Sequence, residues 1–390
     1  MGDAAKQAIA GASLVFGGAR HLELAAPLIS GEGQVWLSPF ERSVEAVLAR
    51  RGYPTVVLAS GDPFFFGVGA TLARRIDPGE MSVMPAPSSF SLAASRLGWP
   101  LQDIATVSLH GRPLDLIRPL LQPGQRVLAL TSDENGPRQL AALLTESGFG
   151  PSRLTVLEAL GGPHERLTHH VVSSFQPDIF HSLNVCAVEV AVEEGARVLP
   201  LAPGLDEALF EHDGQITKRE VRALTLLALA PRKGELLWDI GGGSGSISIE
   251  WMLRDPAMRA IAIEQHPDRA ARIRRNASAF GVPGLTLVEG MAPAALQGLA
   301  APDAIFIGGG GSEDGVFEAA LAALKLGGRL VANAVTLEME AVLLAARARL
   351  GGSLTRIEIA RASPVGTMTG WKPAMPVTQW TWHKNKDVSS

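Results

Sequence analysis

Short apolar runs that end at glycine or proline recur along the whole chain. The runs at 55–59, 126–130 and 236–240 have the length and composition of buried strands. Between such runs the apolar residues recur at helical spacing, as they do in 136–147 and 267–279. Strands that alternate with amphipathic helices predict an α/β fold.

The same patterns predict the remaining elements. In the first half, strands are expected at 14–18, 81–84, 105–109, 154–160 and 185–192, and helices at 4–13, 43–51, 68–76, 91–97 and 114–121. In the second half, strands are expected at 260–263, 285–288, 304–307 and 329–333, with a closing antiparallel pair at 354–361 and 378–382. Helices are expected from Thr217 and at 246–252, 316–325 and 336–350.

The two halves carry different loop motifs, so we interpret them as two different domains and not as a repeat. The segment 197–204 contains two prolines and a glycine and has no periodic pattern. We expect a first α/β domain at 1–198, a linker at 199–204 and a second, Rossmann-like domain at 205–390.

The strongest candidate for a binding site follows the apolar run 236–240. Gly241, Gly243 and Gly245 allow a tight turn before an apolar helical stretch. A strand, a glycine loop and a helix form a nucleotide-binding unit. Glu264 ends the next apolar run, where a carboxylate can accept hydrogen bonds from ribose hydroxyls.

The type of nucleotide is indicated by the residues around this loop. The dinucleotide fingerprint requires a third glycine where Ser246 stands, which argues against an oxidoreductase. Asp239 before the loop and Glu264 after the next strand resemble the class I S-adenosylmethionine (SAM) methyltransferases. The alternative is a glycine-rich turn in another α/β domain.

This resemblance implies a cofactor site and a neighbouring substrate site. The residues implied at the cofactor are Asp239, Gly241, Gly243, Gly245, Glu264 and Gly290, the last in the loop that flanks the adenine. Gly308, Gly309 and Gly310 form a second glycine loop, which leaves room for a large flat substrate.

The segment Ile216 to Arg222 has a further resemblance. Ile-Thr-Lys-x-Glu-Val-Arg before a SAM domain is similar to the cobalamin-pathway enzymes that methylate C15 of the precorrin ring. That likeness implies that Thr217 borders the cofactor. The alternative for Thr217 is a helix N-cap that forms a capping box with Glu220.

Loops of the first half resemble the tetrapyrrole (corrin/porphyrin) methylases. Ser-Gly-Asp-Pro at 60–63, Pro-x-Pro-Ser-Ser at 85–89 and Leu-Gly-Gly-Pro-His-Glu-Arg at 160–166 occur in the order of that family. The likeness implies a SAM site held by loop backbone, with Gly61, Asp62, Ser88 and Ser89 as its residues. The strand and glycine loop that normally open this family are expected to be missing here.

A tetrapyrrole methylase half followed by a C15-methylase half resembles the bifunctional precorrin methylases of cobalamin biosynthesis. This implies SAM-dependent methylation at C5 and C15, with decarboxylation of the ring C acetate. The catalytic groups are left open, with Asp62, Lys218 and Arg222 as candidates. Lys218, Arg219, Arg222, Arg361 and Lys372 are candidates for binding substrate carboxylates.

Three alternatives remain at this point. The second half alone could be active, beside a degenerate tetrapyrrole-binding first half. The chain could be a dinucleotide-dependent oxidoreductase, or a tetrapyrrole carrier without activity.

Composition adds a few limits. The chain has 390 residues, a net charge of −4 and one cysteine, Cys186. This charge is unusual for a nucleic-acid-binding protein, and one cysteine gives no disulfide framework, so a reducing cytoplasm is expected. No apolar run has the length of a membrane span, and no His/Cys/Asp cluster has the spacing of metal ligands. We expect a homo-oligomer that binds a precorrin, SAM and no metal.

Overall fold

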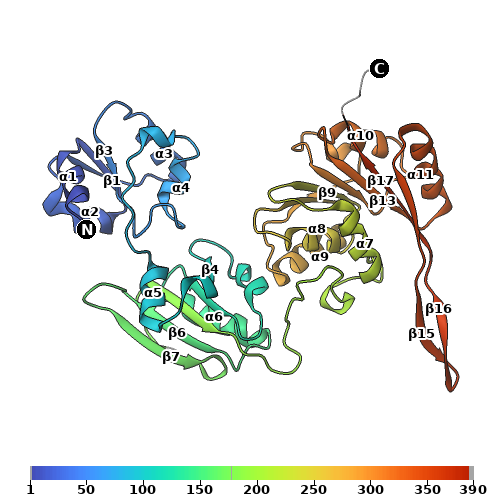
Figure 1. The fold of residues 1–390 in the computed structure, drawn as a ribbon, viewed down its shortest axis with the longest axis horizontal. Coiled ribbons are helices and arrows are strands. Elements are labelled where there is room, and N and C mark those ends of the chain that lie inside the picture. The colour runs from blue at the N-terminus through green and yellow to red at the C-terminus, as the bar shows by residue number, and fades with distance from the viewer. Residues whose placement is uncertain (1, 177, 386–390) are drawn as a thin grey trace. The chain divides into compact units, whose positions relative to one another are not determined.

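The computed structural model describes residues 2–176 and 178–385. The chain divides into two compact units, which are described separately. The first unit comprises residues 1–112 and 124–192, and the second comprises residues 113–123 and 193–390. The predicted α/β fold class is confirmed in both (Figure 1).

The first unit begins with a parallel three-stranded sheet in the order β2-β1-β3. Its strands are β1 (Leu14–Gly17), β2 (Glu32–Val35) and β3 (Thr55–Val57). The helices around it are α1 (Asp3–Gly11), α2 (Ala19–Ala25), η1 (Ala26–Leu28), α3 (Phe40–Leu48), α4 (Val68–Leu72) and η2 (Pro78–Glu80). Ile9, Val15 and Leu58 pack together in its core.

A five-stranded sheet in the order β4-β5-β8-β6-β7 completes the first unit. Its strands are β4 (Ala105–Ser108), β5 (Arg126–Leu130), β6 (Arg153–Glu158), β7 (Arg166–Val171) and β8 (Asn184–Glu189). The accompanying helices are α5 (Ser89–Leu97), η3 (Leu101–Asp103), α6 (Gly136–Glu146) and η5 (Val172–Ser174). Cys186 is fully buried in β8, and this burial raises the pKa of its thiol, which favours a packing role.

Several expectations for the first half were wrong or incomplete. Residues 81–84 form no strand, and the prolines at 85 and 87 that follow them cannot donate ladder hydrogen bonds. The helix expected at 114–121 is the 3₁₀ helix η4 (Leu114–Leu120), which contains Pro119. Strand β2 was missed because its sequence Glu-Gly-Gln-Val has no apolar run and lies largely exposed.

The second unit is built on a seven-stranded sheet in the order β11-β10-β9-β12-β13-β17-β14. Its strands are β9 (Leu236–Ile240), β10 (Arg259–Glu264), β11 (Thr286–Glu289), β12 (Ala304–Ile307), β13 (Arg329–Ala334), β14 (Ser353–Ile357) and β17 (Val377–His383). The strands from β11 to β13 are parallel, and β17 pairs antiparallel with both of its neighbours. The expected closing antiparallel pair is therefore confirmed.

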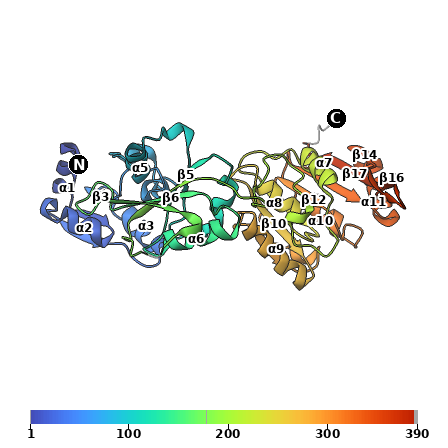
Figure 2. The same cartoon turned by 90° about the horizontal axis from the view of Figure 1, so that it is seen from below.

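Helices cover both faces of this sheet, and alternate strand residues supply the two cores. They are η6 (Glu207–Leu209), α7 (Arg219–Leu229), α8 (Ser246–Met252), α9 (Pro267–Ala279), η7 (Ala294–Leu296), α10 (Val316–Ala323) and α11 (Leu337–Leu350). Leu236, Trp238 and Ile240 pack with α10 and α11, whereas Leu237 packs with α7 and α8. Helices α8 and α9 lie beside β10 (Figure 2).

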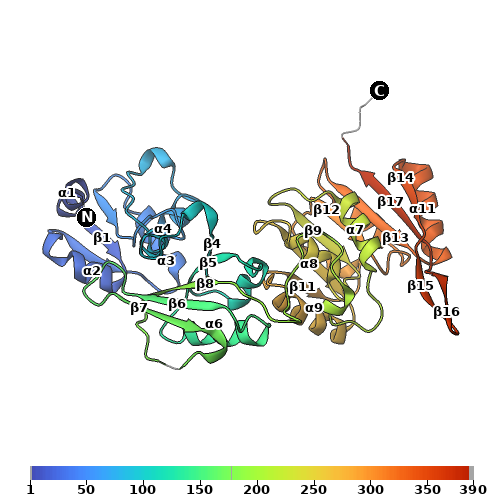
Figure 3. The same cartoon turned by 60° about the horizontal axis from the view of Figure 1, so that its bottom comes forward.

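A two-stranded hairpin extends from the end of this unit. It consists of β15 (Ala360–Val365) and β16 (Met368–Pro373), and it points away from the large sheet (Figures 1 and 3). Val365, Met368 and Trp371 on it are each more than half exposed.

The segment 113–123 belongs to the second unit although it follows β4 of the first. The Gln122 side chain donates a hydrogen bond to the Leu199 carbonyl at 2.9 Å. A Cβ on Gly281 would lie 2.4 Å from Pro119 Cδ, so η4 lies directly on this glycine. Leu199 and Leu205, at the two ends of the proline-containing segment, are buried in a core with Phe210 and Phe280.

A buried ion pair fixes the start of α7. Arg222 and Glu250 have no exposed side-chain surface, and Arg222 Nε donates to Glu250 Oε1 at 2.5 Å. Arg222 also donates to the carbonyls of Thr217 and Leu205. The Glu250 carboxylate in turn accepts the backbone N–H groups of Gly204 and Leu205. The pair therefore joins α7, α8 and the segment before η6.

Arg222→Met should destabilise the second unit by about 3–5 kcal/mol, because it leaves a buried carboxylate without its cation. Urea unfolding followed by tryptophan fluorescence would measure this change. Arg349→Met is the matched control, since its pair with Glu318 is more than half exposed on both sides and should matter by less than about 1 kcal/mol. Equal effects of the two substitutions would contradict the assigned role of Arg222.

Candidate cofactor and substrate site

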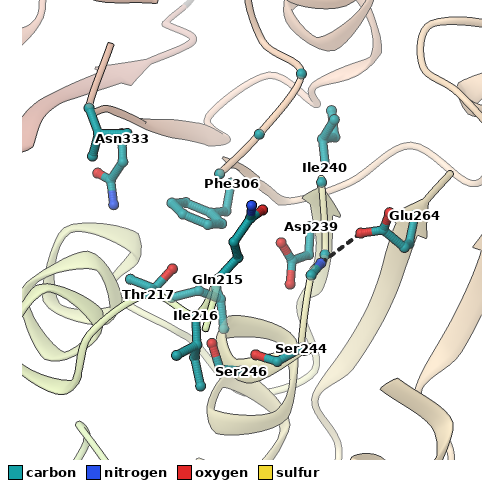
Figure 4. A pocket seen from close by; sticks show the side chains of 18 of the residues that line it. Gln215, Ile216, Thr217, Asp239, Ile240, Ser244, Ser246, Glu264, Phe306 and Asn333 are labelled. Carbon is teal, nitrogen blue, oxygen red and sulfur yellow. Dashed lines mark hydrogen bonds between the residues drawn. The ribbon is translucent and has the colours of Figure 1, made fainter. Parts of the chain in front are cut away.

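A cavity of about 780 Å³ in the second unit opens at the carboxyl ends of its parallel strands. This edge is where open α/β sheets bind ligands. Figure 4 shows side chains from β9, β10, β12 and β13 around the cavity, together with Gln215, Ile216 and Thr217 from the segment before α7. A volume of this size can hold a nucleotide together with part of a second ligand.

The two glycine loops at this edge are in direct backbone contact. Gly241 has a φ of 75°, and a Cβ at this position would lie 2.7 Å from the Gly309 carbonyl oxygen and 2.8 Å from its nitrogen. The Gly308 N–H donates to the Ile240 carbonyl at 3.0 Å. A residue larger than glycine at 241 would therefore separate the loops and change the floor of the cavity.

Gly243 and Gly245 have different surroundings. Gly243 has a φ of 60° and lines the cavity, with the Gln215 carbonyl 3.6 Å from where its Cβ would be. Gly245 has a φ of 75° and starts α8, but it packs against Ile273 and does not line the cavity.

Glu264 connects the end of β10 to the first glycine loop. Its Oε2 accepts the Gly243 N–H at 2.8 Å, and its Oε1 accepts the His266 N–H at 2.9 Å (Figure 4 shows the first of these bonds). The residue is 4% exposed and lines the cavity. Each carboxylate oxygen keeps acceptor capacity beyond its one backbone bond, so Glu264 can also receive hydroxyl groups.

Asp239 lies on β9, just before the first glycine loop, and is 1% exposed. Its Oδ2 accepts hydrogen bonds from the Ser248 hydroxyl at 2.6 Å and from the Ser248 N–H at 3.2 Å. Burial raises the pKa of the Asp239 carboxyl to about 7, although the Ser248 hydrogen bonds act in the opposite direction. The carboxylate therefore braces the start of α8 from inside the protein.

The segment 211–217 covers the glycine loop, and ion pairs to α9 hold it there. Asp213 accepts Arg269 at 2.9 Å and Arg272 at 3.1 Å. The Gln215 backbone N–H and these arginines hold the pKa of the Asp213 carboxyl well below its usual range. The cover is therefore fixed by charges before any ligand binds.

The alternative role of Thr217, as a helix N-cap, is wrong. Helix α7 starts at Arg219 with Lys218 as its N-cap, and no side chain caps it. Glu220 forms an ion pair with Arg361 in place of a capping box. Thr217, Lys218 and Arg361 line the cavity, whereas Arg222 lies outside it in the buried ion pair.

Most of the residues expected at the site meet in this cavity. Those that line it are Thr217, Lys218, Asp239, Gly241, Gly243, Glu264, Gly290, Gly308, Gly309, Gly310 and Arg361. Several further residues line the cavity that were not predicted from the sequence: Gln215, His266, Arg269, Phe306, Glu313 and Asn333. They follow no common motif, and only their places at strand ends or beside known loops could have indicated them.

In the first unit the expected loops also meet. A Cβ on Gly61, where φ is 62°, would lie 2.8 Å from Ser88 Cα, and the Ala86 N–H donates to the Gly61 carbonyl at 3.2 Å. Ser88 caps α5 by accepting the Ser91 N–H at 3.1 Å. Asp62 accepts the Phe64 N–H at 2.8 Å, which makes it part of a local turn.

A cavity of about 210 Å³ next to these loops contains a polar pair that the sequence analysis missed. His21 Nε2 and Ser60 Oγ are 2.6 Å apart, and Ser88 and Ser89 line the same cavity. His21 Nδ1 is buried and has no hydrogen-bond partner within residues 2–176 and 178–385. Burial lowers the pKa of His21, with Arg20 adding to the effect, so the imidazole is neutral at physiological pH.

Two kinds of feature are absent from the described residues, a metal-binding group and a membrane-spanning helix. No three His, Cys, Asp or Glu side chains in 2–176 and 178–385 are placed to hold a metal ion together. Within the same residues, no helix combines the length and apolar character required to cross a bilayer.

Two family models match the chain, one in each half. The Tetrapyrrole (Corrin/Porphyrin) Methylases match residues 3–176, and the Precorrin methyltransferase domain matches residues 208–384. A protein of Sinorhizobium sp named precorrin-6Y C(5,15)-methyltransferase (decarboxylating) is 73% identical over 384 residues, which cover 98% of this chain and 93% of that protein.

Two shorter proteins match about half of the chain. A Salmonella typhimurium protein named cobalt-precorrin-6B C(15)-methyltransferase (decarboxylating) is 33% identical over 166 residues, which cover 42% of this chain and 85% of that protein. A solved C-terminal domain of precorrin-6Y C5,15-methyltransferase from Rhodobacter capsulatus is 52% identical, with a TM-score of 0.45, over 47% of this chain and 100% of that one.

Gly241→Ala should disrupt the cavity, because its methyl group would meet the backbone of Gly309 in a residue that also needs a positive φ. Gly327→Ala is the matched control, since Gly327 has a φ of 78° but no atom within 4 Å of its Cβ position. We expect the control to lose only about 1 kcal/mol of stability, and Gly241→Ala to lose more and to abolish binding of the ligand. Calorimetric titration with SAM and thermal unfolding would measure both, and equal behaviour of the two variants would contradict the contact between the loops.

Asp239→Asn should flatten the pH dependence of stability. In the wild type the folded pKa of about 7 lies above that of an unfolded aspartate, so this group costs stability as pH rises from about 4 through about 7. Asparagine cannot ionise, so the free energy of unfolding of the variant should rise relative to wild type by on the order of 2–4 kcal/mol between pH 5 and pH 8. Urea unfolding at both pH values would test this, and parallel pH profiles would contradict a buried carboxylate with a raised pKa.

Proposed function

The chain belongs to the family of precorrin-6Y C(5,15)-methyltransferases (decarboxylating), and from this we propose that its two units divide the two methylations of that family between them. The protein is a decarboxylating methyltransferase of cobalamin biosynthesis that acts on a precorrin. We assign C15 methylation and decarboxylation to the second unit and C5 methylation to the first.

The cavity of the second unit supports the assignment of C15 methylation and decarboxylation to that unit. The shorter Salmonella relative carries only the C(15) and decarboxylating parts of the name, and the precorrin methyltransferase domain matches residues 208–384. Together they favour a complete C15-methylating and decarboxylating site within the second unit.

The residues of this cavity fit SAM. Gly243 leaves space in the cavity that a Cβ would fill, and Gly241 lets the Gly309 loop lie directly against the first glycine loop. Glu264 offers buried carboxylate oxygens for the two ribose hydroxyls, and Gly290 lies at the end of the next strand, on the side assigned to the adenine. When bound, SAM supplies an electrophilic methyl group.

The protein's own contribution is positioning and the exclusion of water. Phe306 gives an apolar surface beside the glycine loops, and Lys218 and Arg361 supply cations for substrate carboxylates. Glu220 holds Arg361 at the cavity wall, so this guanidinium is oriented before substrate binds. The electron pair released on decarboxylation is accepted by the conjugated macrocycle itself, so the protein needs no electron sink of its own.

The first unit is assigned to C5 methylation on the loops around Gly61 and Ser88. Their close backbone contact and the neighbouring His21–Ser60 pair give this half a cavity with polar groups. The alternative is that only the second unit is active and that the first unit binds tetrapyrrole without methylating it. The mass of the product separates these two possibilities.

Glu264→Ala should weaken SAM binding at the second unit by roughly 1–3 kcal/mol, the range for losing hydrogen bonds to a charged group. Glu289→Ala is the matched control, because Glu289 ends the adjacent strand but is half exposed and pairs with Arg274. Calorimetry with SAM would measure both, with circular dichroism to check folding. Unchanged SAM affinity in a folded Glu264→Ala variant would refute the assignment of the ribose site.

Mass spectrometry of the tetrapyrrole made by each variant of the full chain tests the division of labour. We expect Glu264→Ala to lower decarboxylation and one methylation, and Gly61→Ala to lower the other methylation by forcing the loops of the first unit apart. Loss of both methyl groups in either variant would refute independent sites. A wild-type product with a single added methyl group would favour the alternative.

A further inference from the structure

A buried polar network lies directly behind one wall of the large cavity. Asn333 on β13 and Gln379 on β17 are directly opposite each other in the antiparallel register, and Thr225 on α7 lies between their side chains. Thr225 is fully buried and Gln379 is 5% exposed, whereas Asn333 is partly exposed and lines the cavity. The network therefore reaches the cavity through Asn333.

The hydrogen bonds determine how the Asn333 amide is turned. The Thr225 hydroxyl donates to the Val221 carbonyl at 2.8 Å, so it can only accept from its other partners. Both amides must then present nitrogen to it, and Asn333 Nδ2 and Gln379 Nε2 lie 3.0 Å and 3.2 Å from Thr225 Oγ1. The second N–H of Gln379 goes to Asn333 Oδ1 at 3.0 Å.

This arrangement leaves part of the hydrogen-bonding capacity of the Asn333 amide unused. Its amide has two N–H donors and two lone pairs on the oxygen, and the network uses one of each. One N–H and one lone pair remain for the cavity, held in a fixed orientation by residues that do not touch a ligand themselves. Such advance orientation reduces the entropy lost on binding.

The position of Asn333 assigns it to the substrate and not to the cofactor. Glu264 stands at the end of β10, and the sheet order places β9 and β12 between that strand and β13. Figure 4 shows Asn333 and Glu264 on opposite sides of Phe306. A cofactor whose ribose is at Glu264 and whose remainder lies over the β9 glycine loop leaves the β13 side for the second ligand.

We propose that the free N–H of Asn333 binds the substrate carboxylate that leaves as carbon dioxide; this proposal rests on the function proposed above for the second unit. In that step the bond between the carboxylate and its side-chain carbon breaks, its electron pair passes into the conjugated macrocycle, and the carbon later takes a proton from solvent. Negative charge leaves the carboxylate in the transition state, so a cation bound to it would stabilise the ground state more and slow the step. A neutral amide orients the group with a smaller penalty, while Lys218 and Arg361 remain for carboxylates that stay.

The test uses the full-length chain with precorrin-6Y and excess SAM. Asn333→Asp keeps the shape and the acceptor for Gln379 but replaces the donor with a negative charge, and Asn333→Ala removes the amide. We expect both to lower the decarboxylated fraction of the methylated product at least about tenfold, the effect of losing one hydrogen bond, and to change SAM affinity less than about twofold. Thr225→Val, which leaves Asn333 in place without its fixed orientation, should give a smaller decrease of about threefold.

Controls separate this role from a structural one. Asn135→Asp adds the same charge at an exposed position of the first unit and should change neither quantity. Thermal unfolding of each variant separates an effect on stability from an effect on activity. If Asn333→Asp does not fold, Asn333→Ala replaces it in the test. A structural role alone would lower the melting temperature of the Asn333 and Thr225 variants without changing the decarboxylated fraction.

Three outcomes would overturn the proposal. An unchanged decarboxylated fraction in a folded Asn333 variant excludes contact with the leaving carboxylate. A loss of SAM affinity as large as the loss of decarboxylation would place Asn333 at the cofactor. A loss of methylation as large as the loss of decarboxylation would give Asn333 a general role in binding the ring. Wild-type protein that releases no carbon dioxide would refute the proposed function itself, and this inference with it.

Discussion

The backbone contact between Gly241 and Gly309 is the constraint on which the second unit's site depends. Two neighbouring parallel strands end in glycine loops, and the absence of Cβ atoms lets one loop lie directly on the other. The contact sets the cavity floor, and Glu264 fixes the first loop from the other side through the Gly243 N–H. The site is therefore mostly backbone, positioned by a carboxylate and by missing side chains.

Charged side chains do the remaining positioning, and both Asp239 and the Arg222–Glu250 pair are buried. Asp239 braces α8, the Arg222–Glu250 pair joins α7 to α8, and Asp213 ties the covering segment to α9. Each of these charged groups forms hydrogen bonds or ion pairs with other protein groups, so the cavity walls are ordered without a ligand. Among the groups that line the cavity, Lys218, Arg361 and the oriented Asn333 amide are those that we propose for substrate binding.

Features that depend on one local segment were predictable from the sequence. The glycine loop after β9 and the acid at the end of β10 follow from short runs of residues, because strand, turn and strand-end positions are locally encoded. Features that depend on distant partners were not. The residues around Thr217 match a capping box, but Glu220 forms an ion pair with Arg361, which is far along the chain. Arg222 resembles an exposed cation in the sequence, and only Glu250 on another helix explains its burial.

The segment 113–123 has a consequence for how the protein is made. It is the crossover between the parallel strands β4 and β5, yet it packs with residues near 199 and 281 that are synthesised much later. Until those residues leave the ribosome, Gln122 and Pro119 lack the partners that they contact in the finished protein. The crossover of the first unit therefore reaches its final environment only after much of the second unit has been synthesised.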